Sequence, residues 1–252
     1  MASSLASTDR TAGAASSSGP SLIIIVGLLL VRTVLLFCSA GISYLIARST
    51  GADVGALLIY ANVVIVAVDV ITIALVARLQ RRRGQTLRAL IGDFRGRDLA
   101  WGLLVFAAVM VAMAVANFIA NLIVHQGPPP APTTAPAVPL WLALWSVVVM
   151  PVTVAVAEEV SYRGYAQGAL AQRYRMSVAV LITAAFFGLQ HAALSATGWD
   201  AMATRVITTF GVGVIFGLLR VWLRRLTPLI IGHWLFDVVG LGVPMMLLAM
   251  AG

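Results

Sequence analysis

Apolar residues fill most of this chain in long runs, and short polar segments separate them. The runs cover residues 21–47, 54–77, 99–124, 140–170, 177–196, 203–222 and 227–250. A helix needs about 20 apolar residues to cross the hydrocarbon core of a bilayer. Because a helix satisfies its own backbone hydrogen bonds in lipid, the pattern predicts an all-α protein, a polytopic transmembrane helical bundle of about seven spans.

The composition supports a membrane protein. Of the 252 residues, 61% are hydrophobic and only 10% are charged, whereas soluble globular domains carry about 25% charged residues. The mean hydropathy of +0.99 agrees with this class. Residues 1–20 are rich in Ser, Ala and Gly, which predicts a disordered cytoplasmic tail. Residues 21–252 are then expected to form a single transmembrane helical domain.

The charged residues indicate an orientation in the membrane. The net charge is +8, and all 17 basic residues are arginines. Most of them follow the second, fourth and sixth apolar runs, namely Arg78, Arg81, Arg82, Arg83, Arg88, Arg95, Arg97, Arg173, Arg175, Arg220, Arg224 and Arg225. Arginine-rich loops stay in the cytoplasm, so we expect a cytoplasmic N-terminus. Topology accounts for the arginines, and no nucleic-acid partner is expected. An all-arginine, Ala- and Val-rich chain is typical of GC-rich coding, which predicts a prokaryotic plasma membrane.

Two adjacent carboxylates interrupt the fourth apolar run. Glu158 and Glu159 are the only glutamates in the chain, and an ionisable group inside a membrane indicates a functional site. Glu159 and Arg163 lie four residues apart on one helix face and can pair. Glu158 is rotated from Glu159 by about 100°, so it is expected to face elsewhere and to need its own partner. The alternative is that both glutamates lie at the cytoplasmic end of the span and are solvated.

Two of the three histidines also lie within apolar runs. His191 shares a helix face with Phe187, and His233 shares one with Asp237. A single histidine in a span is often structural, but a His/Asp pair on one face needs a common polar cavity. In the first two runs, Arg32 and Asp69 either pair with each other or line a path for substrate, and the third histidine, His125, receives no role.

The depths of these side chains in the membrane constrain the arrangement. At 1.5 Å per residue, His191 lies about 21 Å into a span that starts near residue 177. Glu158 matches this depth if the fourth span continues to about residue 172, with a bend at Pro151, and does not match it if the span ends near residue 165. His233 lies only about 9 Å from the start of its span. Its convergence with Glu158 therefore requires a tilted helix or an early start.

A carboxylate and imidazoles in a pocket that excludes water suit hydrolysis. In one mechanism, Glu158 and His191 hold and deprotonate a water that attacks a substrate carbonyl, and His233 with Asp237 hydrogen-bonds the developing oxyanion. No acyl-enzyme is expected, because no serine or cysteine nucleophile is required. In the alternative, Glu158, His191 and His233 are ligands of a catalytic zinc ion. The residues alone leave the cofactor undecided between zinc and none.

The three motifs together resemble a known family. E-E-x-x-x-R at 158–163, F-x-x-x-H at 187–191 and H-x-x-x-D at 233–237 occur in the order seen in the CAAX protease and bacteriocin-processing family. This family is also called the abortive-infection family, and it includes the type II CAAX prenyl endopeptidases. The resemblance covers roughly residues 140–240, which it implies are the catalytic core of a helical membrane protease of the glutamate type or a metal-dependent type.

The resemblance also implies roles for individual residues. Glu158 would activate water together with His191, His233 and residue 237 would stabilise the oxyanion, and Glu159 and Arg163 would support the site. Position 237 departs from the family pattern, because the CAAX proteases typically have Asn there. An amide can donate a hydrogen bond to an oxyanion, and an ionised carboxylate cannot. If Asp237 is ionised, its expected role is to orient His233.

Three different functions are compatible with these features. The first is an endopeptidase that acts on a peptide or protein substrate near the membrane, with a bacteriocin-like or signalling peptide favoured over a prenylated protein in a prokaryote. The second is a non-enzymatic membrane scaffold or bacteriocin-immunity protein of the same fold. The third is a small transporter with a carboxylate proton relay. Retention of both glutamates, the arginine and both histidines favours the endopeptidase, because a scaffold has no need for buried charges.

Overall fold

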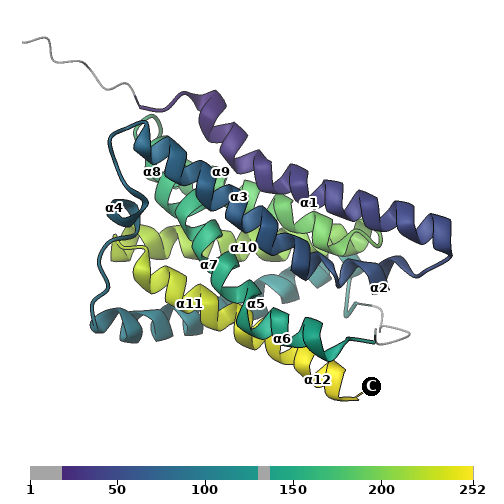
Figure 1. Ribbon diagram of the computed structural model, residues 1–252. Helices are drawn as coiled ribbons and strands as arrows, with labels where there is room; N and C mark the ends of the chain where they lie inside the picture. The colour runs from purple at the N-terminus through teal and green to yellow at the C-terminus, as the bar shows by residue number, and fades with distance from the viewer. Residues whose placement is uncertain (1–18, 130–136, 252) are drawn as a thin grey trace, which may run out of the picture.

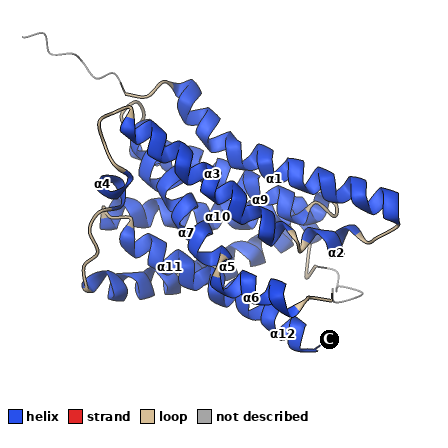
Figure 2. Cartoon of the chain, viewed as in Figure 1, coloured by secondary structure: helices blue, strands red, loops and turns tan. Residues whose placement is uncertain are grey.

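A computed structural model of the chain describes residues 19–129 and 137–251. The described residues form helices and loops and contain no strand (Figure 2). Residues 1–18 of the expected tail lie outside the described part. The long helices run roughly side by side as a bundle (Figure 1), and seven helical stretches in the described residues are long and apolar enough to cross a membrane. The predicted all-α bundle with seven spans is therefore confirmed.

The observed spans begin and end close to the predicted apolar runs. The first is α1 (Leu22–Thr50), and the second combines α2 (Val54–Leu58) with α3 (Ala61–Arg81). The short helix α4 (Leu87–Ile91) lies in the loop before the third span, α5 (Arg97–His125). The fifth span is α9 (Met176–His191) with the 3₁₀ turn η2 (Ala192–Ser195), and the sixth is α10 (Trp199–Leu223). The seventh joins α11 (Thr227–Asp237), the π-helix η3 (Val238–Gly242) and α12 (Val243–Ala251).

The fourth span is interrupted twice. It comprises α6 (Leu140–Val148), α7 (Met150–Glu158), the π-helix η1 (Glu159–Ala166) and α8 (Gln167–Leu170). The first interruption is the break between α6 and α7, which precedes the motif at 158–163, and the second is the π-helix η1, which contains most of that motif. Pro151 lies in the first turn of α7, where its missing N–H leaves no helical hydrogen bond unmade. Because the span continues to Leu170, the long fourth span expected from the depth of Glu158 is confirmed.

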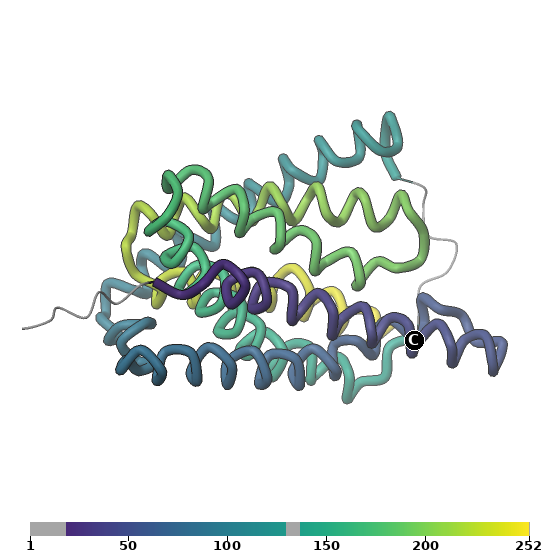
Figure 3. The backbone as a smooth tube through the Cα atoms, turned by 90° about the horizontal axis from the view of Figure 1, so that it is seen from above, coloured from purple at the N-terminus to yellow at the C-terminus, as the bar shows by residue number. Residues whose placement is uncertain are grey.

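The helices that carry the motifs pack against one another. Helix α10 packs on both α9 and α5, and α11 packs on α5 and α7. Helix α1 runs between α3 and α9, as the view from above shows (Figure 3). Apolar side chains remain exposed on the outer surfaces, for example Ile23, Trp199 and Met250. A bundle with an apolar exterior and buried polar groups suits a lipid environment.

Close approach of α5 and α11 fixes the position of the residue before His233. A Cβ atom on Gly232 would lie 2.8 Å from the backbone oxygen of Gly102 and 2.6 Å from Cβ of Val105. Only a residue without a side chain allows the two helix backbones to lie this close. The contact therefore sets how far His233 projects into the bundle.

Candidate active site

The two glutamates of the fourth span lie deep inside the bundle. Glu158 is 3% exposed and Glu159 is fully buried, so the interpretation that they are solvated at the end of the span is wrong. Glu158 is the last residue of α7, and Glu159 is the first of the π-helix η1. Single π turns inside α-helices are rare and often occur at functional sites. The carboxylates therefore lie where the helix geometry changes.

One oxygen of Glu158 is fixed by two hydrogen bonds. Its Oε1 accepts from Nη2 of Arg32 at 3.0 Å and from Nε2 of Gln190 at 2.9 Å. The other oxygen, Oε2, is buried and has no hydrogen-bond partner among the described residues. It lies 3.6 Å from Nε2 of His233. Glu158 is thus held rigidly on one side and keeps an acceptor on the other.

Arg32 joins the first two spans to this site. Its Nη1 pairs with Asp69, its Nη2 binds Glu158, and its Nε donates to Oε1 of Gln190 at 2.9 Å. The expected pair of Arg32 and Asp69 is therefore present, but it is part of the candidate site and not a separate structural pair. The planar guanidinium donates to three acceptors in fixed directions. Arg32 thereby orients the Glu158 carboxylate and offsets its charge.

Sequence reasoning missed Gln190, which connects Arg32 to the fourth and fifth spans. Its side chain donates to Glu158, and its Oε1 accepts from Arg32 and from the hydroxyl of Tyr162 at 3.0 Å. The available signal was its place beside His191 in an apolar run. An amide buried at 1% exposure needs partners, and here it finds three.

Glu159 and Arg163 form the expected pair. Nη1 of Arg163 lies 3.3 Å from Oε1 of Glu159, and both side chains are buried. Nη2 of Arg163 donates to the backbone oxygen of Gly213 at 3.2 Å. The guanidinium carbon lies 4.2 Å from the centre of the Phe187 ring and 4.9 Å from that of Phe216, within the range of cation–π attraction. Phe187 thus contributes an aromatic face to this buried arginine.

His233 lies among three carboxylates. Its Nδ1 is 2.9 Å from Oε1 of Glu159, so the ring donates this N–H to the carboxylate. Its Nε2 lies 3.6 Å from Glu158 and 3.7 Å from Oδ2 of Asp237. The ring packs at 30° on Phe216, with centroids 4.6 Å apart. Glu158 and Glu159 point in different directions, as expected, yet each reaches a different nitrogen of this imidazole.

Asp237 shares the face of His233, as its spacing predicts, but forms no hydrogen bond to it. A separation of 3.7 Å exceeds hydrogen-bond length. Oδ2 of Asp237 is buried without a partner among the described residues. Nε2 of His233 therefore faces two carboxylate oxygens, one from Asp237 and one from Glu158, and both lie beyond hydrogen-bond length.

His191 lies at the edge of this cluster and is the motif histidine with partial exposure. Its Nδ1 lies 2.7 Å from the backbone oxygen of Phe187. Because a carbonyl only accepts, Nδ1 carries the proton, and Nε2 of the neutral ring is a base. Nε2 makes no hydrogen bond within the described residues. No direct hydrogen bond joins His191 to Glu158, so the expected partnership of these two residues needs an intervening group.

The zinc alternative finds no ligand set in the described part of the chain. No group of three or more His, Cys, Asp or Glu side chains there is arranged to hold a metal ion. The guanidinium of Arg32 already lies 3.0 Å from Glu158, and its charge would oppose a second cation at that carboxylate. The residues Glu158, His191 and His233 do not fit a zinc site in this geometry, and we derive no step through a metal.

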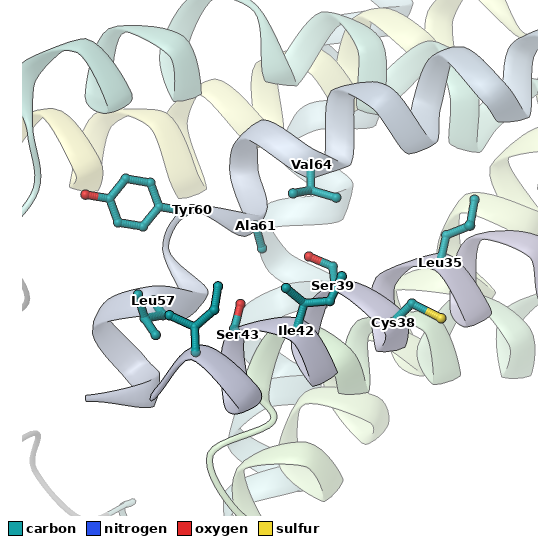
Figure 4. A pocket seen from close by; sticks show the side chains of 10 residues that line it. Leu35, Cys38, Ser39, Ile42, Ser43, Leu57, Tyr60, Ala61 and Val64 are labelled. Carbon is teal, nitrogen blue, oxygen red and sulfur yellow. The ribbon is translucent and has the colours of Figure 1, made fainter. Parts of the chain in front are cut away.

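The described surface also contains hollows outside this cluster. One is an apolar cavity of about 400 Å³ between α1 and α2–α3 (Figure 4). Leu35 and Ile42 of α1 line it opposite Leu57 and Val64. Its hydroxyl and thiol groups come from Ser39, Ser43, Tyr60 and Cys38. It contains no carboxylate, histidine or arginine, and the candidate active site does not extend into it.

Comparison with known families finds one match, over the segment that carries the three motifs. A family model described as type II CAAX prenyl endopeptidase Rce1-like matches residues 139–239. Over this segment, which is less than half of the chain, the protein is similar to the Rce1-like family. The match includes Glu158, His191, His233 and Asp237, and its limits agree with the expected core at 140–240. No curated protein and no solved structure matches the chain.

Proposed function

We propose that this protein is an intramembrane endopeptidase in which Glu158 and His191 activate a water molecule to hydrolyse a peptide bond. The observation that carries the proposal is the state of the Glu158 carboxylate. Arg32 and Gln190 fix its Oε1, while its buried Oε2 makes no hydrogen bond to a described residue. A carboxylate with one fixed oxygen and one available acceptor suits a general base whose position must be maintained.

His191 supplies a second acceptor for the same water. Its Nδ1 donates to the backbone of Phe187, so Nε2 accepts. A water between Oε2 of Glu158 and Nε2 of His191 donates one hydrogen to each and directs its lone pair at a substrate carbonyl. Attack transfers a proton to one of these acceptors and forms a tetrahedral intermediate without an acyl-enzyme. The same proton then passes to the leaving amine.

His233 is suited to stabilise the negative charge that develops on the carbonyl oxygen. Glu159 fixes the ring through Nδ1 at 2.9 Å, which leaves Nε2 directed towards the space between Glu158 and Asp237. The buried cluster contains two arginines, Arg32 and Arg163. It contains four carboxylates, those of Asp69, Glu158, Glu159 and Asp237. With every carboxylate ionised and His233 neutral, the formal charge of the cluster is 2 − 4 = −2. A protonated His233 reduces this imbalance and presents Nε2–H as an oxyanion donor.

The substrate class follows from where the site lies. Its catalytic groups are buried between apolar spans, so a substrate must reach them from the membrane or its surface. A membrane-associated protein or peptide is the proposed substrate, with a bacteriocin-like or signalling peptide as the favoured kind. The protein is proposed to reside in a prokaryotic plasma membrane with a cytoplasmic N-terminus, as the arginine-rich loops favour.

The test compares peptide termini in membrane and secreted fractions of cells that express wild-type protein or Glu158→Gln at matched levels. Asp93→Asn, which removes an exposed carboxylate that pairs with Arg88, is the matched control. New termini with wild type and Asp93→Asn, but not with Glu158→Gln, would support proteolysis and reveal the substrate. A phenotype that Glu158→Gln leaves intact would favour the scaffold or immunity function instead.

A further inference from the structure

A second hollow near the opposite end of the bundle from the arginine-rich loops is lined by polar groups. It has a volume of about 950 Å³ and lies between the last turns of α5 and the first turns of α10. These two helix ends lie at the same end of the molecule (Figure 3). His125, Thr204 and Asp200 line it together with Arg205, and His125 accepts or donates a hydrogen bond with Thr204 at 3.2 Å.

Arg205 is the arginine that lines this cavity. It lies about 9 Å along α10 from its first residue, inside a membrane-spanning helix. Its Nε donates to Oγ of Ser195 at 3.1 Å, while Nη1 and Nη2 make no hydrogen bond or ion pair with the described residues. Arg32 and Arg163, by contrast, are both paired with carboxylates. An intramembrane guanidinium with two open nitrogens is suited to a bidentate anion.

Two buried side chains in the same cavity also have unused hydrogen-bonding groups. Oγ1 of Thr208, a residue 4% exposed, and Oδ1 of Asn121, a residue 8% exposed, have no partner among the described residues. Both residues line the cavity. A buried polar atom without a partner destabilises the protein, so a bound ligand that pairs with it is favoured. Thr208 can donate to an oxygen, and Oδ1 of Asn121 can accept from an N–H.

This set of groups fits one kind of ligand. The guanidinium of Arg205 and the hydroxyl of Thr208 can donate hydrogen bonds to a carboxylate. Oδ1 of Asn121 can accept a hydrogen bond from a peptide N–H. An isolated inorganic anion would use the donors and leave Asn121 without a partner. Asp200 is exposed at the cavity, and its charge disfavours anions that cannot reach Arg205.

We propose that the cavity between α5 and α10 binds an acidic peptide segment of the substrate, with Arg205 as the residue that recognises its carboxylate. This inference rests on the proposed peptidase function. The cavity adjoins the catalytic histidine through η2, because Ser195, the partner of Arg205, follows His191 by four residues. Thr209, next to Thr208, also contacts the backbone of Gly188 in α9. The carboxylate would belong either to an Asp or Glu side chain or to the C-terminus.

Binding can be measured separately from cleavage in full-length protein that carries Glu158→Gln and is held in lipid nanodiscs. The probes are fluorescent Ala- and Leu-based peptides that carry either one internal Glu or a Gln at the same position. Each of these peptides is made with a free C-terminus and with an amidated C-terminus. We expect the carboxylate-bearing form to bind on the order of tenfold more tightly, as one charged hydrogen-bonded contact provides. Comparison of the Glu/Gln pairs with the free/amidated pairs identifies the source of the carboxylate.

Arg205→Gln should abolish this preference while leaving the affinity for the neutral, amidated peptide unchanged. Arg220→Gln is the matched control, because Arg220 lies in the same helix, has no carboxylate ion pair within the described residues and does not line the cavity. Thermal unfolding of each variant checks that it is folded. Equal affinity for acidic and neutral peptides, or a preference that survives Arg205→Gln, would overturn the inference. If the protein cleaves peptides but shows no preference for a carboxylate in binding, this site is wrong and the proposed function stands. If it prefers the carboxylate but shows no cleavage that depends on Glu158, the proposed function is wrong and the binding site stands.

Discussion

Nδ1 of His233 lies 2.9 Å from Oε1 of Glu159, so the second glutamate of the pair orients the imidazole that the first glutamate faces. In the proposed mechanism, Glu159 positions His233 and Glu158 is the residue that activates water. The proposal thereby assigns a different role to each of the two adjacent carboxylates. It also predicts different effects of removing each contact.

Removal of Arg163 should mainly destabilise the protein. Arg163→Met removes the arginine partner of the buried Glu159, and breaking a buried ion pair from one side costs about 3–5 kcal/mol. The double variant Glu159→Gln/Arg163→Met should recover part of this loss, because the carboxylate that lost its arginine partner is then also removed. Thermal unfolding in one detergent compares the single and double variants. Additive losses would show that the two side chains are not coupled.

Arg32 should act as a positioning residue. Arg32→Lys keeps the charge but loses the planar fork that reaches Asp69, Glu158 and Gln190 together. We expect kcat to fall by roughly 10²-fold, as a misplaced catalytic group produces, with little change in KM. Arg48→Lys, an exposed change at the end of the same helix, is the control. A kcat equal to wild type in Arg32→Lys would contradict the positioning role.

The two histidines should respond differently to added imidazole. Alanine at His191 should lower the rate by about 10²–10⁴-fold, the usual contribution of a general base, and exogenous imidazole should restore part of it, because His191 is partly exposed. Alanine at His233 should also lower the rate, by about 10²–10³-fold for a lost oxyanion donor. His233 is 3% exposed, so imidazole should not restore activity there. Rescue of both variants, or of His233→Ala alone, would contradict these assignments.

Asp237 offers a test of the oxyanion site. Asp237→Asn removes a negative charge near Nε2 of His233 and adds an amide donor, so the rate should stay within about one order of magnitude of wild type, or 1.4 kcal/mol. Asp237→Ala should fall below this range. The comparison of kcat for the two variants is the measurement. If Asn is as harmful as Ala, the carboxylate acts by orienting His233 and not at the oxyanion.

The helices were predictable because lipid imposes a simple requirement. Every backbone group in the bilayer must be satisfied within its own helix, so apolar length alone located the spans. Small differences occur where helix ends continue into the interface; the second span, for example, reaches Arg81 instead of residue 77. Loop residues do not alter this pattern, since they lie outside the hydrocarbon region.

The site was predictable only in part. The spacing within one helix placed Glu159 with Arg163 and His233 beside Asp237. Contacts between spans were not readable, because a long side chain such as Arg32 can reach several neighbours and the sequence does not state which helices adjoin. The contact of Arg32 with Gln190 joins residues 158 positions apart. The π-helix that begins at Glu159 also leaves no mark in the apolar pattern.

Hydrolysis by purified protein tests the central proposal most directly. Wild-type protein and Glu158→Gln are reconstituted in liposomes, matched for amount and for thermal unfolding, and supplied with peptides from the membrane and secreted fractions of the source cells. Mass spectrometry of the new termini gives the rate. We expect cleavage by wild type and a loss of at least about 10²-fold in Glu158→Gln, as removal of a general base produces. Equal cleavage by both proteins would contradict the assignment of Glu158 as the residue that activates water.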